Sequence, residues 1–158
     1  MSMEHSKAVY RRYLQEVFNQ GQVELLDELL SPSYVYHDAP PGTPPGAEGI
    51  KQVVKMFHTG FPDLEITIDD IVAEGDKVAV RTTTRGTHTG MIFGIPPTGK
   101  VVTMRGQTLV RIVAGRLTDS WVNNDVMGLM NQLGAGSQSA PVSTPKPTSK
   151  ARSEAQVQ

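Results

Sequence analysis

A β-hairpin followed by a short helix is predicted by residues 101–134, which read VVTMRGQTLVRIVAGRLTDSWVNNDVMGLMNQLG. Two long segments rich in apolar residues flank Ala114-Gly115, a dipeptide suited to a two-residue turn. Such a turn would pair Val113 with Arg116 and Thr108 with Trp121, further from the turn. One face, expected to be the inner one, would then carry a mixed set of residues: Met104, Thr108, Val110, Ile112, Leu117, Asp119, Trp121, Asn123 and Asp125. The helix is expected from Val126 to Leu133, with Gly134 as its C-terminal cap.

The chain before this hairpin changes from a helical to a strand period of apolar residues. Apolar residues at helical spacing predict helices near residues 9–20 and 47–60. An apolar run that ends at Ser31-Pro32 predicts a further helix at 23–30. Alternation and β-branched or aromatic residues predict strands at 34–37, from residue 64 onward and at 78–89. Helices first and then a mostly antiparallel meander indicate the α+β class, with a curved sheet wrapped around the N-terminal helices.

Composition excludes several classes of protein. The 158 residues hold 15 Lys and Arg against 16 Asp and Glu, so a surface that neutralises nucleic-acid phosphates is not expected. There is no Cys, which removes disulfides, thiolate zinc sites and a Cys nucleophile. No apolar stretch approaches a membrane span, and residues 1–10 hold no secretory core. We expect a soluble, cytoplasmic protein.

The end of the chain has a different composition. Residues 134–158 contain no Leu, Ile, Met or aromatic residue and are dominated by Ser, Thr, Pro, Gln and Ala. Such a segment buries too little apolar surface to offset its chain entropy, so a disordered tail is expected after a folded domain at 1–133. A weak basic docking function for the tail is the alternative.

Asp125 is the first candidate catalytic residue. On an inner, apolar face its pKa would be raised by desolvation, which suits a general acid or base near neutral pH. Trp121 beside it would offer a flat wall to a planar ligand. However, Asp125 directly precedes the predicted helix and is equally suited to be its N-cap. The local sequence leaves both roles open.

Two of the four histidines are candidate site residues, with His37 expected at the mouth of a pocket and His88 on the inner-facing side of its strand near the loop end. His37 ends a strand before the Pro-rich loop 38–46, and His88 shares the parity of Val78 and Val80. Either is also compatible with a hydrogen-bonded structural histidine. A zinc site from His37, His88 and Asp125 has no helical i, i+4 pairing to support it, so we expect no metal. The chain also lacks a G-x-S-x-G elbow, a G-x-G-x-x-G motif and a Walker loop, so no nucleotide cofactor is expected.

Several segments together resemble one family. YRRYLQEVFNQG at 10–21, YVYHDAPPG at 34–42, GTHTG at 86–90, FGIPPTGK at 93–100 and the closing segment 114–134 are similar to the SnoaL-like polyketide cyclase (ester cyclase) family of the nuclear transport factor 2-like superfamily. The resemblance spans about residues 7–134. It implies a cone-shaped α+β barrel with a deep pocket between sheet and helices, and a homodimer formed through the sheet.

The resemblance also implies a reaction. Cyclases of this family close a ring by intramolecular aldol condensation without a metal or organic cofactor, an isomerase- or lyase-type chemistry. An Asp near the end of the last strand acts as acid and base, which corresponds here to Asp125. His37, His88 and Asn123 would orient carbonyl oxygens of a polyketide-like ligand. Trp121, Met104 and Phe93 would shape the pocket wall.

Other activities of the superfamily match the sequence less well. Related epoxide hydrolases place Arg and Asp two residues apart on one strand, whereas Arg105 is followed at that spacing by Gln107. No Tyr occurs on the late strands to match the ketosteroid isomerases. The main alternative is a module of the same fold that binds a small apolar ligand, or serves in assembly, without chemistry.

Overall fold

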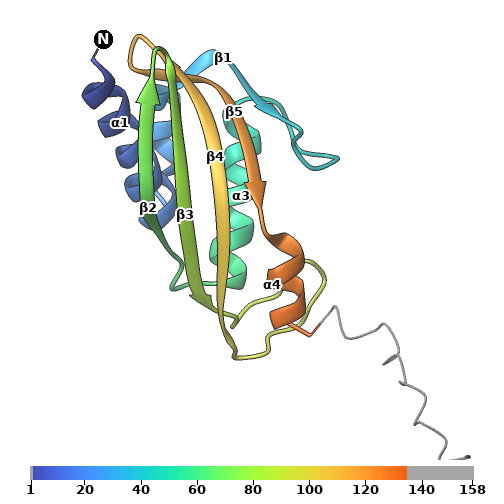
Figure 1. Cartoon of the computed structure of the whole chain (residues 1–158). Helices are drawn as coiled ribbons and strands as arrows, with labels where there is room; N and C mark the ends of the chain where they lie inside the picture. The colour runs from blue at the N-terminus through green and yellow to red at the C-terminus, as the bar shows by residue number, and fades with distance from the viewer. Residues whose placement is uncertain (1, 135–158) are drawn as a thin grey trace, which may run out of the picture.

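A curved five-stranded sheet carries the long helices on one of its faces (Figure 1). The computed structural model describes residues 2–134. The strand order is β1-β5-β4-β3-β2, with β1 parallel to β5 and the other neighbours antiparallel. The strands are β1 (Leu30–His37), β2 (Glu65–Glu74), β3 (Lys77–Thr87), β4 (Val101–Val113) and β5 (Arg116–Asn124). The α+β prediction is therefore confirmed.

The N-terminal helix is longer and less regular than its apolar pattern predicts. It begins as α1 (Met3–Arg12), where the Ser2 hydroxyl accepts the His5 N–H, and continues as a π-helix, η1 (Tyr13–Asn19). The next helical segment is a 3₁₀ turn, η2 (Val23–Leu25), followed by α2 (Leu26–Leu29). The third predicted helix is α3 (Ala47–Gly60), and the last is α4 (Val126–Gln132). A π-helical turn inside an α-helix is rare and often lies at a functional site.

Strand β1 begins earlier than predicted. The sequence indicated a strand only from Tyr34, whereas the structure extends it back to Leu30, through Pro32. Because β1 is an edge strand, Pro32 does not remove a hydrogen bond from the centre of the sheet. The pairing with β5 is irregular between Leu30 and Val35.

Two apolar clusters hold the helices to the sheet. The larger lies between the helical layer and the upper sheet and includes fully buried Val17, Leu26, Val78, Val110 and Leu117. The smaller lies at the lower end, where α4 covers the sheet (Figure 1), and joins residues from α4, β4 and the loops: Phe61, Leu64, Ile92, Val102, Met104, Leu129 and Leu133. The space between these clusters is where a pocket can form.

The predicted register of the β4–β5 hairpin is wrong beyond its first two pairs. Val113 pairs with Arg116 and Ile112 with Leu117, as expected, but Arg111 then pairs with Asp119. The extra residue, Thr118, forms a β-bulge. A bulge inserts one residue into one strand, which moves every later side chain to the other face. Asp119, Trp121 and Asn123 therefore lie on the outer face, and Ser120, Val122 and Asn124 lie on the inner one.

Two further expectations concern the C-terminal segment and membrane-spanning helices. The predicted tail, 134–158, lies outside the described residues except for Gly134, which has a φ of 85° directly after the last turn of α4. Within residues 2–134, no helix is both long and apolar enough to cross a lipid bilayer.

Candidate functional site

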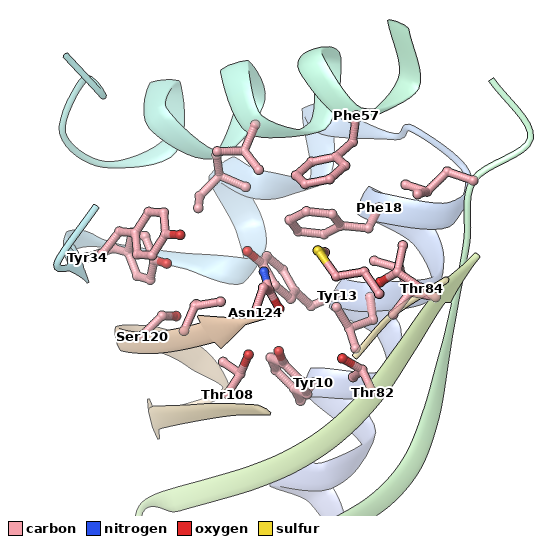
Figure 2. Close-up of a pocket in the computed structure, with 18 residues that line it drawn as sticks. Tyr10, Tyr13, Phe18, Tyr34, Phe57, Thr82, Thr84, Thr108, Ser120 and Asn124 are labelled. Carbon is pink, nitrogen blue, oxygen red and sulfur yellow. The ribbon is translucent and has the colours of Figure 1, made fainter. Parts of the chain in front are cut away.

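A pocket lies between the inner face of the sheet and the helices η1 and α3. Figure 2 shows side chains from both layers pointing into it, with Tyr10, Phe18 and Phe57 from the helices and Thr82 and Thr108 from the sheet. The cavity has a volume of about 90 Å³, which is room for several water molecules. The lining is Tyr10, Tyr13, Leu14, Phe18, Tyr34, Tyr36, Ile50, Val53, Phe57, Leu64, Ile66, Thr82, Thr84, Met104, Thr108, Ser120, Val122 and Asn124.

Most polar groups in this pocket are hydroxyls. The Tyr10 side chain is hydrogen-bonded to Thr108, and Tyr34 is hydrogen-bonded to both Tyr13 and Ser120. These hydroxyls belong to side chains that are almost completely buried, with Tyr10, Tyr13 and Tyr34 only 3%, 5% and 5% exposed. A buried tyrosine satisfies its hydroxyl with a partner of this kind. The pocket therefore offers pre-placed donors that a ligand oxygen can engage.

Burial keeps the tyrosines of the pocket neutral. It raises the pKa of Tyr10 and of Tyr13 well above the usual value, and it raises the pKa of Tyr34 to about 12. Burial also raises the pKa of Tyr36. Desolvation penalises the charged phenolate, so the phenol is the form present at neutral pH. Each of these groups is a hydrogen-bond donor rather than a base.

The described pocket carries no formal charge. None of its lining residues is Asp, Glu, His, Lys or Arg. An isolated charge is costly to bring into such an apolar space without a partner. The pocket is therefore suited to an uncharged ligand with carbonyl or hydroxyl oxygens. Among residues 2–134 there is also no group of three or more His, Asp or Glu side chains placed to hold a metal ion.

Asp125 lies next to the pocket in sequence but is not part of its lining. Its neighbour Asn124 is a lining residue, and the Asn124 amide oxygen lies over the backbone of Gly106. Asp125 itself is exposed and forms the N-cap of α4, where its Oδ1 accepts the Gly128 N–H at 2.9 Å. The backbone N–H of Asp125 donates to the carbonyl of Arg105. The expected inner, apolar environment of this carboxylate is therefore wrong, and capping is its visible role.

His37, Trp121 and Asn123 lie on the opposite side of the sheet from the pocket. The His37 ring stacks on Trp121, and its Nε2 donates to Asp119 Oδ1 at 2.9 Å. Asn123 and Trp121 line a shallow groove on the outer face. The prediction that these three side chains border the pocket is wrong. The bulge at Thr118 moved Trp121 and Asn123 to the outer face of β5, and on β1 the alternation that directs Tyr34 and Tyr36 into the pocket directs His37 away from it.

His88 is fully buried but does not line the described pocket. Its Nδ1 accepts the backbone N–H of Thr98 at 3.2 Å and lies 2.9 Å from the Thr98 hydroxyl. A neutral ring that accepts at Nδ1 carries its proton on Nε2, and this nitrogen has no partner among the described residues. His88 thus holds the loop 88–100 in place from inside.

The two remaining predicted wall residues have different positions. Met104 is a lining residue of the pocket. Phe93 is not: it lies on the loop 88–100 with a φ of 51° and packs edge-on against Phe57, with ring centroids 6.3 Å apart. Phe57 does line the pocket. Phe93 therefore supports the wall from behind.

Sequence reasoning overlooked the tyrosines. Tyr10 and Tyr13 lie on the apolar stripe of the first helix, and Tyr34 and Tyr36 share one face of a strand. Four tyrosines directed into one core require hydroxyl partners and thereby indicate a polar site inside it. The same alternation places His37, with Val35, on the other face of β1. The signal was present in the sequence.

The chain is similar in sequence to two proteins named as methyl ester cyclases. The chain is 28% identical over 120 residues to nogalonic acid methyl ester cyclase of Streptomyces nogalater, covering 74% of this chain and 89% of that one. It is also 28% identical over 127 residues to aklanonic acid methyl ester cyclase DnrD of Streptomyces peucetius, covering 78% and 87%.

Solved structures share the fold. The structure of TsrD from Streptomyces laurentii superposes with a TM-score of 0.77 at 30% identity, covering 85% of this chain and 98% of that one. IdmH from Streptomyces antibioticus superposes with a TM-score of 0.71 at 38% identity, covering 82% and 98%. The model of the SnoaL-like polyketide cyclase family matches residues 7–133. The chain therefore belongs to the SnoaL-like polyketide cyclase family.

Proposed function

We propose that this protein is a cofactor-independent cyclase that closes a ring in a polyketide-like ester by intramolecular aldol condensation without loss of water. The observation that carries the proposal is the uncharged pocket lined by buried hydroxyls. A methyl ester presents carbonyl oxygens without a charge, which fits this lining better than a free carboxylate does. The cyclases to which the chain is similar are named for methyl esters.

The reaction needs one base and several hydrogen-bond donors. The base removes a proton from a carbon flanked by carbonyl groups, the resulting enolate forms a carbon–carbon bond to a second carbonyl carbon, and the new alkoxide takes the proton back. Tyr34, Ser120 and the amide of Asn124 would donate to the carbonyl oxygens as negative charge develops there. A hydroxyl engaged with another side chain would turn from that partner to the substrate.

Asp125 is the proposed base. It follows Asn124 directly, and its cap hydrogen bond uses Oδ1. Its second oxygen, Oδ2, would receive the proton while the cap stays in place. No carboxylate lies in the described lining itself, so the substrate would extend from the pocket toward the start of α4.

A specific observation favours a second candidate function, that of a binding module. The only ionisable side chains in the described lining are tyrosines whose pKa values are raised, and none of them is a base at neutral pH. A pocket of this kind can hold a neutral aromatic compound without changing it. The two functions share a ligand class and differ in whether Asp125 takes part.

Turnover by Asp125 variants separates the two functions. Purified protein is mixed with nogalonic or aklanonic acid methyl ester, and formation of a cyclised isomer of unchanged mass is followed by chromatography and mass spectrometry. Asn and Ser are good N-caps, so Asp125→Asn and Asp125→Ser should keep the fold while turnover falls about 10²-fold or more. Asp125→Ala should in addition lose about 1 kcal/mol of stability.

Each result of this experiment has a clear meaning. Full turnover in Asp125→Asn would exclude the carboxylate as acid or base. Absence of turnover in the wild type, with tight binding of either ester, would favour the binding module. Free acids of the same compounds are the matched control, and they should bind more weakly than the esters.

We also infer that two copies associate through the outer face of the sheet. Val72 is 63% exposed there, and the shallow groove beside it is lined by Leu109 and Trp121 as well as by Asp70 and Arg81. A two-fold axis would bury these apolar residues between the copies, while Arg81 stays ion-paired with Asp70 of its own chain at 2.7 Å. Light scattering should give twice the chain mass, and Leu109→Glu should give the single-chain mass.

A further inference from the structure

We propose that His58 and Asn19, neither of which lines the pocket, are positioning residues that set the shape of its aromatic end. We call this pair the aromatic-end clamp. The inference rests on the proposed function only in taking this pocket as the ligand site. It applies equally to a cyclase and to a binding module.

The first half of the clamp joins two helices. The His58 ring on α3 is hydrogen-bonded through Nε2 to the backbone carbonyl of Phe18, at 2.5 Å. A carbonyl only accepts, so the ring nitrogen is the donor. Phe18 lies in the last turn of η1, where helix carbonyls lack partners within the helix. His58 therefore satisfies a helix end and ties α3 to η1.

The second half of the clamp joins the same helix end to the edge of the sheet. The Asn19 amide donates through Nδ2 to the Ile66 carbonyl at 3.0 Å and accepts the Ile66 N–H through Oδ1 at 2.7 Å. Strand β2, to which Ile66 belongs, is an edge strand with no further strand beside it. The side chain of Asn19 thus takes the place of a strand neighbour for one residue.

All three hydrogen bonds of the clamp join residues that line the pocket or are next to a lining residue in the chain. Phe57 precedes His58, Phe18 precedes Asn19, and Phe57, Phe18 and Ile66 are all lining residues. Figure 2 shows Phe57 and Phe18 facing into the pocket from the helical side. The backbone atoms that carry these three walls are therefore held together by two polar side chains outside the pocket.

The π-helix explains why such a clamp is needed. In η1 the Gln20 N–H donates to the Gln15 carbonyl, five residues back, at 3.0 Å. The wider π turn brings Tyr13, Leu14 and Phe18 to the pocket side at the cost of regular α-helical bonding. Bonds to His58 and Asn19 fix the end of this turn against α3 and β2. Without them, Phe18 would lose its fixed position relative to Phe57.

The test measures binding of methyl anthraquinone-2-carboxylate, a neutral planar conjugated carbonyl compound, by quenching of tyrosine fluorescence. His58→Ala and Asn19→Ala should each weaken binding about tenfold, because a small displacement of the pocket wall reduces its contact with the planar ligand. His58→Gln retains a side-chain N–H donor and should stay within about threefold of the wild type. Thr59→Ala, on the same turn of α3 with an exposed side chain, is the matched control and should bind as the wild type does.

Further readouts separate positioning from mere stabilisation. If an ester is turned over, His58→Ala should raise KM and leave kcat unchanged, because the residue does not touch the reacting atoms. Asn19→Ala should also speed hydrogen exchange at the Ile66 amide, whereas Asn19→Asp retains the acceptor and should protect it. Folded His58→Ala and Asn19→Ala with wild-type affinity for the anthraquinone ester would overturn the clamp. Failure of the wild type to turn over any ester would count against the cyclase alone, because the binding measurement still decides the clamp.

Discussion

The imidazole of His37 lies flat on the indole of Trp121, with ring centroids 4.5 Å apart and planes only 4° from parallel. The two residues are direct partners in the parallel pairing of β1 with β5. They occupy the face of the sheet opposite the pocket. The stack is part of a polar network in which Asp119 is bound by His37, Thr118 and Arg111. Both aromatic rings, predicted for a ligand site, instead stabilise the outside of the sheet.

Acid stability should depend on Asp119. Its pKa is lowered by the hydrogen bonds from His37 and Thr118 and by the charge of Arg111. A carboxylate whose pKa is lowered on folding adds stability above its unfolded value of about 4, and this stability is lost as the pH falls through the folded value. In this acid range the free energy of unfolding of Asp119→Asn should therefore fall less than that of the wild type. Urea unfolding at several pH values measures both.

Two further variants check this assignment. Glu24→Gln, at an exposed position, is the control and should leave the acid profile unchanged. His37→Ala should cost roughly 1 kcal/mol through the lost stack and should leave ligand affinity unchanged. A clear change of ligand affinity in His37→Ala would contradict the placement of His37 outside the site.

Alkaline titration should report the buried tyrosines. All four tyrosines of the chain have raised pKa values, that of Tyr34 reaching about 12. A group whose pKa is raised on folding contributes stability that is complete below its unfolded value of about 10 and is lost as the pH rises toward the folded value. Tyrosinate absorbance should therefore appear together with the loss of circular dichroism. A gradual tyrosinate signal centred on the usual pKa, with the fold intact, would refute this.

Gly90 should tolerate no side chain. A Cβ at this position would lie 1.8 Å from the backbone carbonyl oxygen of Thr59, and the Gly90 N–H donates to the Gly60 carbonyl. Gly90→Ala should thus push the loop 88–100 away from the end of α3 and cost about 1–3 kcal/mol in unfolding free energy. Thr89→Ala, at the exposed neighbouring position, should change the free energy by less than about 0.5 kcal/mol. Equal stability of the two variants would show that the loop can move without cost.

Local patterns in the sequence predicted the elements of the fold well. The bounds of β4 and β5, the turn at Ala114-Gly115 and the extent of α3 follow from apolar period, turn chemistry and glycine positions. These are short-range properties, because they depend on each residue's own conformational preference and on its near neighbours in the chain. The segment 30–33 was the main error, because only the edge position of β1 allows a strand to contain Pro32.

The site was predicted less well, and one residue accounts for most of the difference. Thr118 is polar and lies in an otherwise regular strand, so nothing in the local sequence marks it as a bulge. Its insertion moved Trp121 and Asn123 out of the site and brought Ser120 and Asn124 into it. Asp125 remained compatible with both proposed roles by sequence, and the structure gives it a cap hydrogen bond.

The sequence by itself determined the family and the α+β order of elements, because these depend on composition and spacing along the chain. Only the tertiary structure decided which side chains meet in the pocket. That outcome depends on the register between strands, where a shift of one residue exchanges the two faces of the sheet. It also depends on contacts between distant segments, such as His58 with Phe18 and Asn19 with Ile66. Neither the register nor these contacts can be read from neighbouring residues.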